Sequence, residues 1–237
     1  MKRLLALLFL FASRVLAGGF SFDPQFTPQQ LSDLGEAMAE LLAFPNLTTA
    51  APSGVAGFEV MGVAGGLSVS SRERWYRYAV DEKTTLGLLP AYRVVARKGL
   101  PWNLDVGAQY GQFAGEPFWG GELRWSLFEG GVILPALGLS GSWTWLSHPQ
   151  VDFRVGELKL VASKGFVLLA PYAGVGVRHQ KIEAFFGDPA PRWHRAQGDR
   201  TVVLAGVVIH PLPLLRVVAE ARRGAFTSYF VALGVGL

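Results

Sequence analysis

The chain contains no cysteine, which excludes a disulfide framework, thiolate catalysis and a lipidated N-terminal cysteine. Charged residues make up only 17% of it, while half of its 237 residues are hydrophobic. Beyond the N-terminus, however, no uninterrupted apolar run approaches the 18 or so residues of a transmembrane helix. The hydrophobic residues come instead in short alternating segments separated by glycine-rich turns, a pattern typical of a membrane β-barrel.

The N-terminus has the three parts of a secretory signal peptide. Lys2 and Arg3 form a charged start, an apolar run follows at 4–12, and Ala17 provides a small-residue cleavage site. A membrane anchor is the alternative, but the run is short and Arg14 interrupts its end. We therefore expect residues 1–17 to direct export and to be removed.

Cleavage would also change the charge balance of the chain. Loss of Lys2, Arg3 and Arg14 takes the formal net charge from +4 to +1. The basic character of the full sequence is therefore weak evidence for a nucleic-acid partner, and none is expected.

Residues 18–53 differ from the rest of the chain and predict one helix at about 27–44. Thr27, Pro28 and Gln30 fit an N-cap, a proline at the first helical position and a capping-box partner. Apolar residues follow at helical spacing: Leu31, Leu34, Met38 and Leu41. Because the helix precedes the first strand, we expect it on the periplasmic side, plugging the lumen, covering its mouth or lying on the membrane surface. A helix that only fills a gap is the alternative.

From Gly54 onward the chain alternates as β-strands do. The clearest segment, 102–111, sets Trp102, Val106 and Tyr110 against a polar opposite face. An aromatic residue thus stands at each end of an apolar face, as in a membrane barrel with aromatic girdles and a wet lumen. The last segment, 227–237, has an apolar face, no charged residue and the length of a transmembrane strand.

The whole region 54–237 predicts an all-β, antiparallel up-and-down transmembrane barrel. Ten strands are expected, at 54–70, 85–97, 102–111, 118–128, 132–146, 151–162, 166–182, 201–209, between 213 and 223, and 227–237. Merging two weak strands would leave eight. Long connections at 71–84 and 185–200 are expected to be extracellular, with short turns and both termini periplasmic.

Two short motifs carry a resemblance. Ser163 to Phe166, followed by the Pro-Tyr-Ala-Gly-Val-Gly stretch at 171–176, is similar to a strand of OmpW-like and other opacity-type barrels, small proteins of the Gram-negative outer membrane. The stretch Tyr229 to Leu237 resembles the C-terminal signal read by the barrel assembly machinery, with Leu237 in place of the usual phenylalanine. The resemblance implies an outer-membrane location and a role as narrow channel, adhesin or anchor.

Charged residues collect on the predicted lumen face. They are Arg93, Arg97, Asp105, Glu122, Arg124, Glu157, Lys159, Arg178, Arg216, Glu220 and Arg222. In a barrel of eight to ten strands, such charges can pair across the bore and rigidify it. The alternative is a selectivity filter whose cationic excess favours anions.

Aromatic residues on the opposite face predict a girdle at the membrane boundary. They are Trp102, Tyr110, Trp119, Trp125, Trp143, Trp145 and Tyr229. Two further basic and aromatic patches, at 72–78 and 193–195, suggest contact with lipopolysaccharide phosphates, unless they too belong to an ordinary girdle.

Catalysis is not expected. His148, Asp152, Asp188, His194 and Asp199 lie in or near predicted external loops, where omptin-type proteases carry Asp and His pairs, but spacing alone does not unite them. The chain has no Gly-x-Ser-x-Gly elbow, His-Glu-x-x-His motif or P-loop, and no cofactor or metal is predicted.

Three functions remain open at this stage. The first is a narrow passive channel for small solutes, with the N-terminal helix as plug or lid. The second is a sealed barrel with a structural or surface-binding role. The third is a secreted, lipocalin-like binding barrel, whose apolar residues would point inward.

Overall fold

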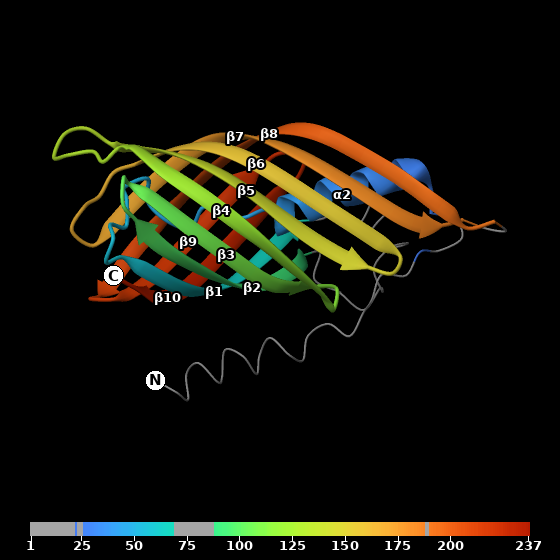
Figure 1. Ribbon diagram of the computed structural model, residues 1–237, viewed down its shortest axis with the longest axis horizontal. Coiled ribbons are helices and arrows are strands. Elements are labelled where there is room, and N and C mark those ends of the chain that lie inside the picture. Colours follow the sequence, from blue (N-terminus) through green and yellow to red (C-terminus); the bar gives the residue numbers. More distant parts are fainter. Residues whose placement is uncertain (1–21, 23–25, 69–87, 188–189) are drawn as a thin grey trace, which may run out of the picture.

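The structure, a computed structural model, describes residue 22 and the ranges 26–68, 88–187 and 190–237. These residues form one helix and ten strands: α2 (Pro28–Leu42), β1 (Phe58–Ser68), β2 (Leu88–Leu100), β3 (Leu104–Phe113), β4 (Glu116–Phe128), β5 (Ala136–His148), β6 (Val151–Ser163), β7 (Leu169–Phe186), β8 (Arg192–Leu212), β9 (Leu215–Arg223) and β10 (Thr227–Gly236). Each strand pairs antiparallel with its neighbours in sequence, and β1 closes on β10 (Figure 1). The predicted fold class, an antiparallel up-and-down barrel of ten strands with one helix, is confirmed.

The strands tilt strongly relative to the barrel axis. Starting at Ile209 on β8 and following paired residues once around the wall through β9, β10 and β1, one returns to β8 at Gln197. This offset between the start and the end of the circuit is the shear that closes a barrel, and it requires tilted strands.

The strand connections define two ends of the barrel. The turns at 101–103, 129–135, 164–168 and 213–214 lie with the C-terminus, at what we call the C-terminal end. The hairpins at 114–115, 149–150 and 224–226, and the ends of β7 and β8 at Phe186 and Arg192, lie at the other end, which we call the opposite end. In Figure 1, β7 and β8 reach furthest toward the opposite end.

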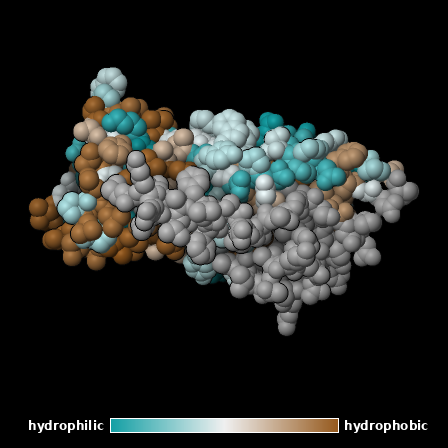
Figure 2. All heavy atoms as spheres, turned by 90° about the horizontal axis from the view of Figure 1, so that it is seen from below, coloured by the Kyte–Doolittle hydropathy of each residue, from teal (hydrophilic) through white to brown (hydrophobic). Residues whose placement is uncertain are grey.

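The wall is apolar outside and polar inside over its middle part. On β3, Asp105 and Gln109 are buried in the interior, whereas Val106 and Tyr110 are exposed on the outer surface. Figure 2 shows hydrophobic atoms gathered over the C-terminal end and hydrophilic atoms further along the barrel. This arrangement is the reverse of a soluble binding barrel, in which the apolar side chains line the interior.

Several strand boundaries differ from those expected. The predicted long loop at 185–200 is wrong, because β7 and β8 remain paired out to Phe186 and Arg192. The paired part of β7 and β8 that extends beyond Val203, which we call the ribbon, is polar. Hydrophobic alternation therefore did not reveal it. Residues 132–135 and 166–168 are turns, not the first residues of strands. Strand β3 begins at Leu104, since Trp102 and Asn103 have positive φ angles of 62° and 60°, as in a tight hairpin turn. The predicted loop 71–84 lies outside the described residues.

The helix α2 lies within the barrel. Its N-cap is Thr27, and the capping box with Gln30 is present. Phe26, just before it, packs edge-on against Phe186 with ring centroids 4.9 Å apart, which places the start of the helix at the opposite end. The helix therefore begins at the end of the barrel opposite to the start of β1.

An extended segment connects the helix to the wall. Residues 43–53, which we call the strap, run from the end of α2 along the bore to the C-terminal end. Just beyond the strap, the Gly99 N–H donates to the Gly57 carbonyl at 3.0 Å. The N-terminal part of the described chain therefore traverses the interior from one end to the other. No helix among the described residues is both long and apolar enough to cross a membrane.

Candidate functional site: the charged bore and its strap

All of the predicted lumen charges lie on the inner face of the wall. Their side chains are buried except that of Arg216, which is partly exposed near the C-terminal end. They occupy alternate positions on β2, β3, β4, β6, β7 and β9, which is why they share one face.

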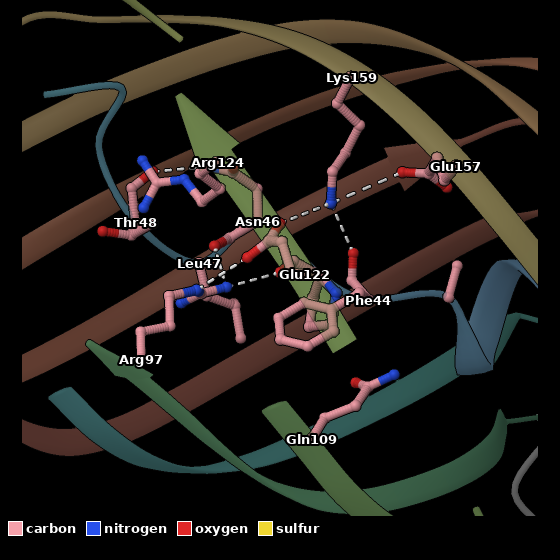
Figure 3. Close-up of polar contacts among 12 residues, drawn as sticks. Phe44, Asn46, Leu47, Thr48, Arg97, Gln109, Glu122, Arg124, Glu157 and Lys159 are labelled. Carbon is pink, nitrogen blue, oxygen red and sulfur yellow. Dashed lines mark hydrogen bonds and ion pairs between the residues drawn. The ribbon is translucent and has the colours of Figure 1, made fainter. Parts of the chain in front are cut away.

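These charges form ion pairs across the bore. Arg97 on β2 bonds to Glu122 on β4 at 2.9 Å and also to Glu59 on β1. Lys159 on β6 reaches the same Glu122 carboxylate at 3.3 Å, as Figure 3 shows. Arg222 on β9 pairs with Glu157 on β6. Removing one partner from such a buried pair typically costs about 3–5 kcal/mol, so the network resists disruption.

The first part of the strap, residues 44–46, is hydrogen-bonded to this network. The Arg97 guanidinium donates to the carbonyl oxygens of Pro45 and Asn46 at 3.0 and 2.7 Å. The Lys159 ammonium donates to the Phe44 carbonyl at 2.7 Å (Figure 3). The strap thus satisfies donors that the carboxylates leave free.

Glu220, on β9, accepts hydrogen bonds from the strap. Its carboxylate accepts backbone N–H groups from Asn46 at 3.2 Å and Leu47 at 2.9 Å. It also accepts the hydroxyl of Tyr172 at 2.7 Å.

The second part of the strap, residues 49–53, is also hydrogen-bonded to the wall. The Ala50 N–H donates to the Ser163 hydroxyl at 2.8 Å, and the Ala50 carbonyl accepts the Ser126 hydroxyl at 2.7 Å. Arg124 donates to the Thr49 carbonyl, and Ser53 N–H donates to Asp105 at 3.2 Å. Since Ser126 is on β4 and Ser163 on β6, the strap is tied to several strands at once.

The helix is held mainly by packing. The predicted plug residues Leu31, Leu34, Met38 and Leu41 are completely buried. Two carboxylates make ion pairs with the wall, Glu40 with Arg178 at 3.0 Å and Glu36 with Arg200 at 2.6 Å.

Arg93 closes the C-terminal end of α2. Its guanidinium donates to the carbonyl oxygens of Leu41, Leu42 and Ala43, which lack partners within the helix. The rings of Phe118 and Phe230 lie 5.1 and 5.3 Å from the guanidinium carbon. A cation at this position also suits the negative end of the helix dipole.

Sequence analysis missed three carboxylates of the bore. Glu36 and Glu40 lie on α2, for which sequence analysis singled out only the apolar residues. Glu59 alternates with the outward-facing Val60 on β1, so strand periodicity would have placed it on the lumen face. The strap carries no periodic signal that could have revealed its role.

The residues considered for protease chemistry have separate partners. His148 faces Glu116 at 3.6 Å, Asp152 pairs with Arg154 at 3.0 Å, and His194 stacks on Phe186. Asp199 lies 2.7 Å from the Nδ1 atom of His179, a residue not singled out from the sequence. Asp188 is not among the described residues. Within the described part of the chain, no group of three or more His, Asp or Glu residues could hold a metal ion.

The predicted girdle residues all lie on the outer surface. Trp119 and Trp145 stack at 4.2 Å, and Trp143 meets Trp145 edge-on at 5.7 Å. Tyr110, Trp125 and Tyr229 are exposed, and Trp102 projects from its turn. Of the two basic patches, 72–78 is outside the described residues. In the other, Trp193 packs near Phe185 and Arg195 pairs with Glu183.

Comparison with known proteins finds only distant structural similarity. No protein-family model matches the chain, and no curated protein does. Among solved structures, the N-terminal β-barrel domain of Pseudomonas aeruginosa OprF covers 78% of this chain and 99% of its own, at 14% identity and a TM-score of 0.38. Ail of Yersinia pestis covers 76% and 97%, at 10% identity and 0.36, and the KdgM porin 75% and 98%, at 6% and 0.39. Similarity this distant assigns no function.

Proposed function

We propose that the chain is an exported outer-membrane barrel that seals its own bore and acts as a membrane-anchored structural or binding protein. The support for membrane insertion is the wall itself, which is closed, apolar outside and polar inside. A closed barrel leaves no unpaired strand edge in lipid, and the exposed apolar side chains would be covered by acyl chains.

The strap is the observation that carries the sealed state. It lies in the bore with Phe44 and Leu47 completely buried, and its backbone is bonded to several strands. A ten-stranded barrel is narrow, so an extended segment together with paired charges fills it. A small solute would have to displace these bonded groups.

The alternative of a narrow channel requires more than movement of α2. The helix is bonded to the wall through Glu36, Glu40 and the carbonyls at its C-terminal end, whereas the strap is bonded along most of its length. Departure of the helix would nevertheless leave residues 43–53 bonded across the bore. The geometry therefore favours the sealed barrel, and the anion-selective channel remains the competing prediction.

In a sealed barrel, the ribbon of β7 and β8 would make the contacts with molecules outside the membrane. It extends past the ladder between β8 and β9, which begins only at Val203. Trp193 and Arg195 are exposed on it, and we propose them as contacts for lipopolysaccharide phosphates. We also propose that residues 1–17 are the export signal and that Tyr229 to Leu237 contacts the barrel assembly machinery.

The sealed state can be tested by measuring conductance while a reversible disulfide fixes the strap to the wall. The Cβ atom of a residue at Gly138 would lie 3.5 Å from Cβ of Ala50, within the range of a disulfide. In the cysteine-free chain, the Ala50→Cys, Gly138→Cys variant can therefore fix the strap to β5. A matched pair, Gly35→Cys with Ile182→Cys, would fix only the helix, since Gly35 has the same 3.5 Å relation to Ile182.

In planar bilayers, we expect no steady current from the wild-type barrel or from either locked variant. A variant lacking residues 26–53 should conduct if it folds. Channels in the wild type that close when the strap pair is oxidised and reopen on reduction would overturn the proposal and establish a gated channel. Channels that persist in both locked forms would overturn it as well, because solute would then pass around the strap.

A further inference from the structure

Three turns at the C-terminal end are apolar and exposed. They contribute Val132, Ile133 and Leu134 between β4 and β5, Phe166, Val167 and Leu168 between β6 and β7, and Leu212 and Leu214 at the turn between β8 and β9. We call these eight residues the apolar turn patch. Val132 and Val167 are 98% and 96% exposed, so the protein itself covers almost nothing of them.

Such exposure needs an explanation. Turns are usually built from polar residues and glycine because they face water. Fully burying one large aliphatic side chain is worth about 1.5–3 kcal/mol, so leaving several side chains in water is unfavourable. Contiguous exposed apolar patches mark surfaces that contact a membrane or another protein.

The patch continues the lipid-facing surface of the wall. On β4, Leu127 and Phe128 are exposed directly before the first turn, and Leu137 on β5 is exposed after it. Leu169 plays the same part after the second turn. Figure 2 shows hydrophobic atoms over this end of the molecule.

Several backbone groups of the turns are bonded within the protein, which lowers the cost of placing them in lipid. The Lys164 ammonium donates to the carbonyl oxygens of Gly131, Val132 and Leu134 at 2.5, 2.7 and 3.2 Å. The Gly131 N–H also donates to Leu134, at 3.0 Å.

Several backbone groups of the second turn are also hydrogen-bonded within the protein. The N–H groups of Phe166 and Lys164 donate to the carbonyls of Leu169 and Pro171 at 2.8 and 3.0 Å, and the Leu168 carbonyl accepts the N–H of His210. The two turns therefore combine apolar side chains with several backbone groups that are bonded within the protein.

The height of the apolar band also points to lipid. On β7 the outward apolar positions run from Leu169 to Val177, before His179 begins the polar part. At about 3.3 Å per residue and a tilt of about 40°, the stretch from Leu169 to Val177 rises only about 20 Å. The apolar band of outer-membrane barrels is about 25 Å tall. The strand alone is too short, and the turn residues supply the missing height.

We propose that the apolar turn patch is immersed in the hydrocarbon layer, so that the C-terminal end of the barrel is anchored in lipid by its turns. The inference rests on the proposed membrane insertion but not on whether the bore is sealed. A protein partner is the competing occupant. Interfaces with proteins usually offer polar recognition groups around an apolar centre, whereas here Lys164 and several turn backbone groups bond to other groups of this protein.

Spin labels on single cysteines test the proposal in the full-length mature chain. Ile133→Cys and Val167→Cys place a label on the patch, Val203→Cys places one in the middle of the outer wall, and Gln197→Cys places one on the polar ribbon. In phospholipid vesicles, relaxation by oxygen reports lipid, and relaxation by a water-soluble nickel chelate reports water. We expect the two patch labels to match Val203, with several-fold greater relaxation by oxygen than by nickel. Gln197 should show the reverse.

The controls separate the ways in which the idea can fail. If Val203 reports lipid while Ile133 and Val167 report water, the turns lie outside the membrane, and a protein partner is the better explanation of the patch. If Val203 also reports water, membrane insertion itself is wrong and the inference falls with it. Neither outcome depends on the conductance result, which tests the bore alone.

Discussion

At the scale of single residues, two glycines on β1 face different surroundings. A Cβ atom at the inward-facing Gly65 would lie 2.6 Å from the ring of Phe230, whereas at the outward-facing Gly62 it would meet nothing closer than 3.9 Å. We expect Gly65→Ala to destabilise the barrel by about 1–3 kcal/mol through overpacking. Gly62→Ala should change the free energy of unfolding by less than about 0.5 kcal/mol. Urea titration in micelles, followed by tryptophan fluorescence, measures both, and equal effects would contradict the packing shown here.

Arg93 is a second residue whose role can be measured. Arg93→Met keeps a long side chain but removes the donors to the carbonyls of Leu41, Leu42 and Ala43. Gln109 would still donate to the Leu42 carbonyl at 3.1 Å, whereas the other two carbonyls would lose the donor that the structure shows for them. We expect a loss of about 1–3 kcal/mol in the free energy of unfolding. Arg154→Met is the matched control, because its exposed pair with Asp152 is worth less than about 1 kcal/mol. A loss no larger than that of the control would show that Arg93 does not secure the helix.

At the scale of elements, the ribbon of β7 and β8 carries a charge cluster beyond the apolar band. Hydrogen bonds from Lys181 and Arg195 lower the pKa of Glu183 below its ordinary value. A carboxylate with a lowered pKa in the folded state stabilises that state above its unfolded pKa, and the contribution is lost as the pH falls through the folded pKa. The ribbon should therefore loosen under acid conditions.

Carbon-13 NMR of the Glu183 carboxyl measures this pKa directly. The pKa should rise toward the ordinary glutamate value in both Lys181→Met and Arg195→Met, because each variant removes one donor. Gln197→Met, on the same ribbon without a bond to Glu183 in the described contacts, should leave it unchanged. A Glu183 pKa that stays low in both donor variants would refute the assigned cause.

At the scale of the whole molecule, the path of the N-terminal segment determines which side of the membrane it faces. Because α2 begins beside Phe186 and the strap ends at the C-terminal end, Gln29 and Gln150 lie at the same end of the barrel. Gln29→Cys and Gln150→Cys should react alike with a membrane-impermeant maleimide on intact expressing cells. If one reacts only after permeabilisation and the other without it, the segment does not traverse the bore as described.

Much of the wall could be predicted from the sequence because alternation is a local property. The lumen charges and the girdle aromatics were predicted on opposite faces from strand periodicity alone, and the structure places them on the inner and outer faces of the wall. Periodicity failed where both faces have similar polarity or where a turn is apolar. The polar ribbon of β7 and β8 was therefore taken as a loop, and the apolar turns at 132–134 and 166–168 were taken as strand.

The sequence by itself determined that this chain forms a closed antiparallel barrel with one capped N-terminal helix, since alternation, turn residues and capping residues act between near neighbours. Only the tertiary structure decided where residues 26–53 lie. That segment is placed by bonds between residues more than a hundred positions apart, such as Lys159 with Phe44 and Glu220 with Leu47. No local pattern encodes such contacts, because they exist only once the wall has closed around the strap.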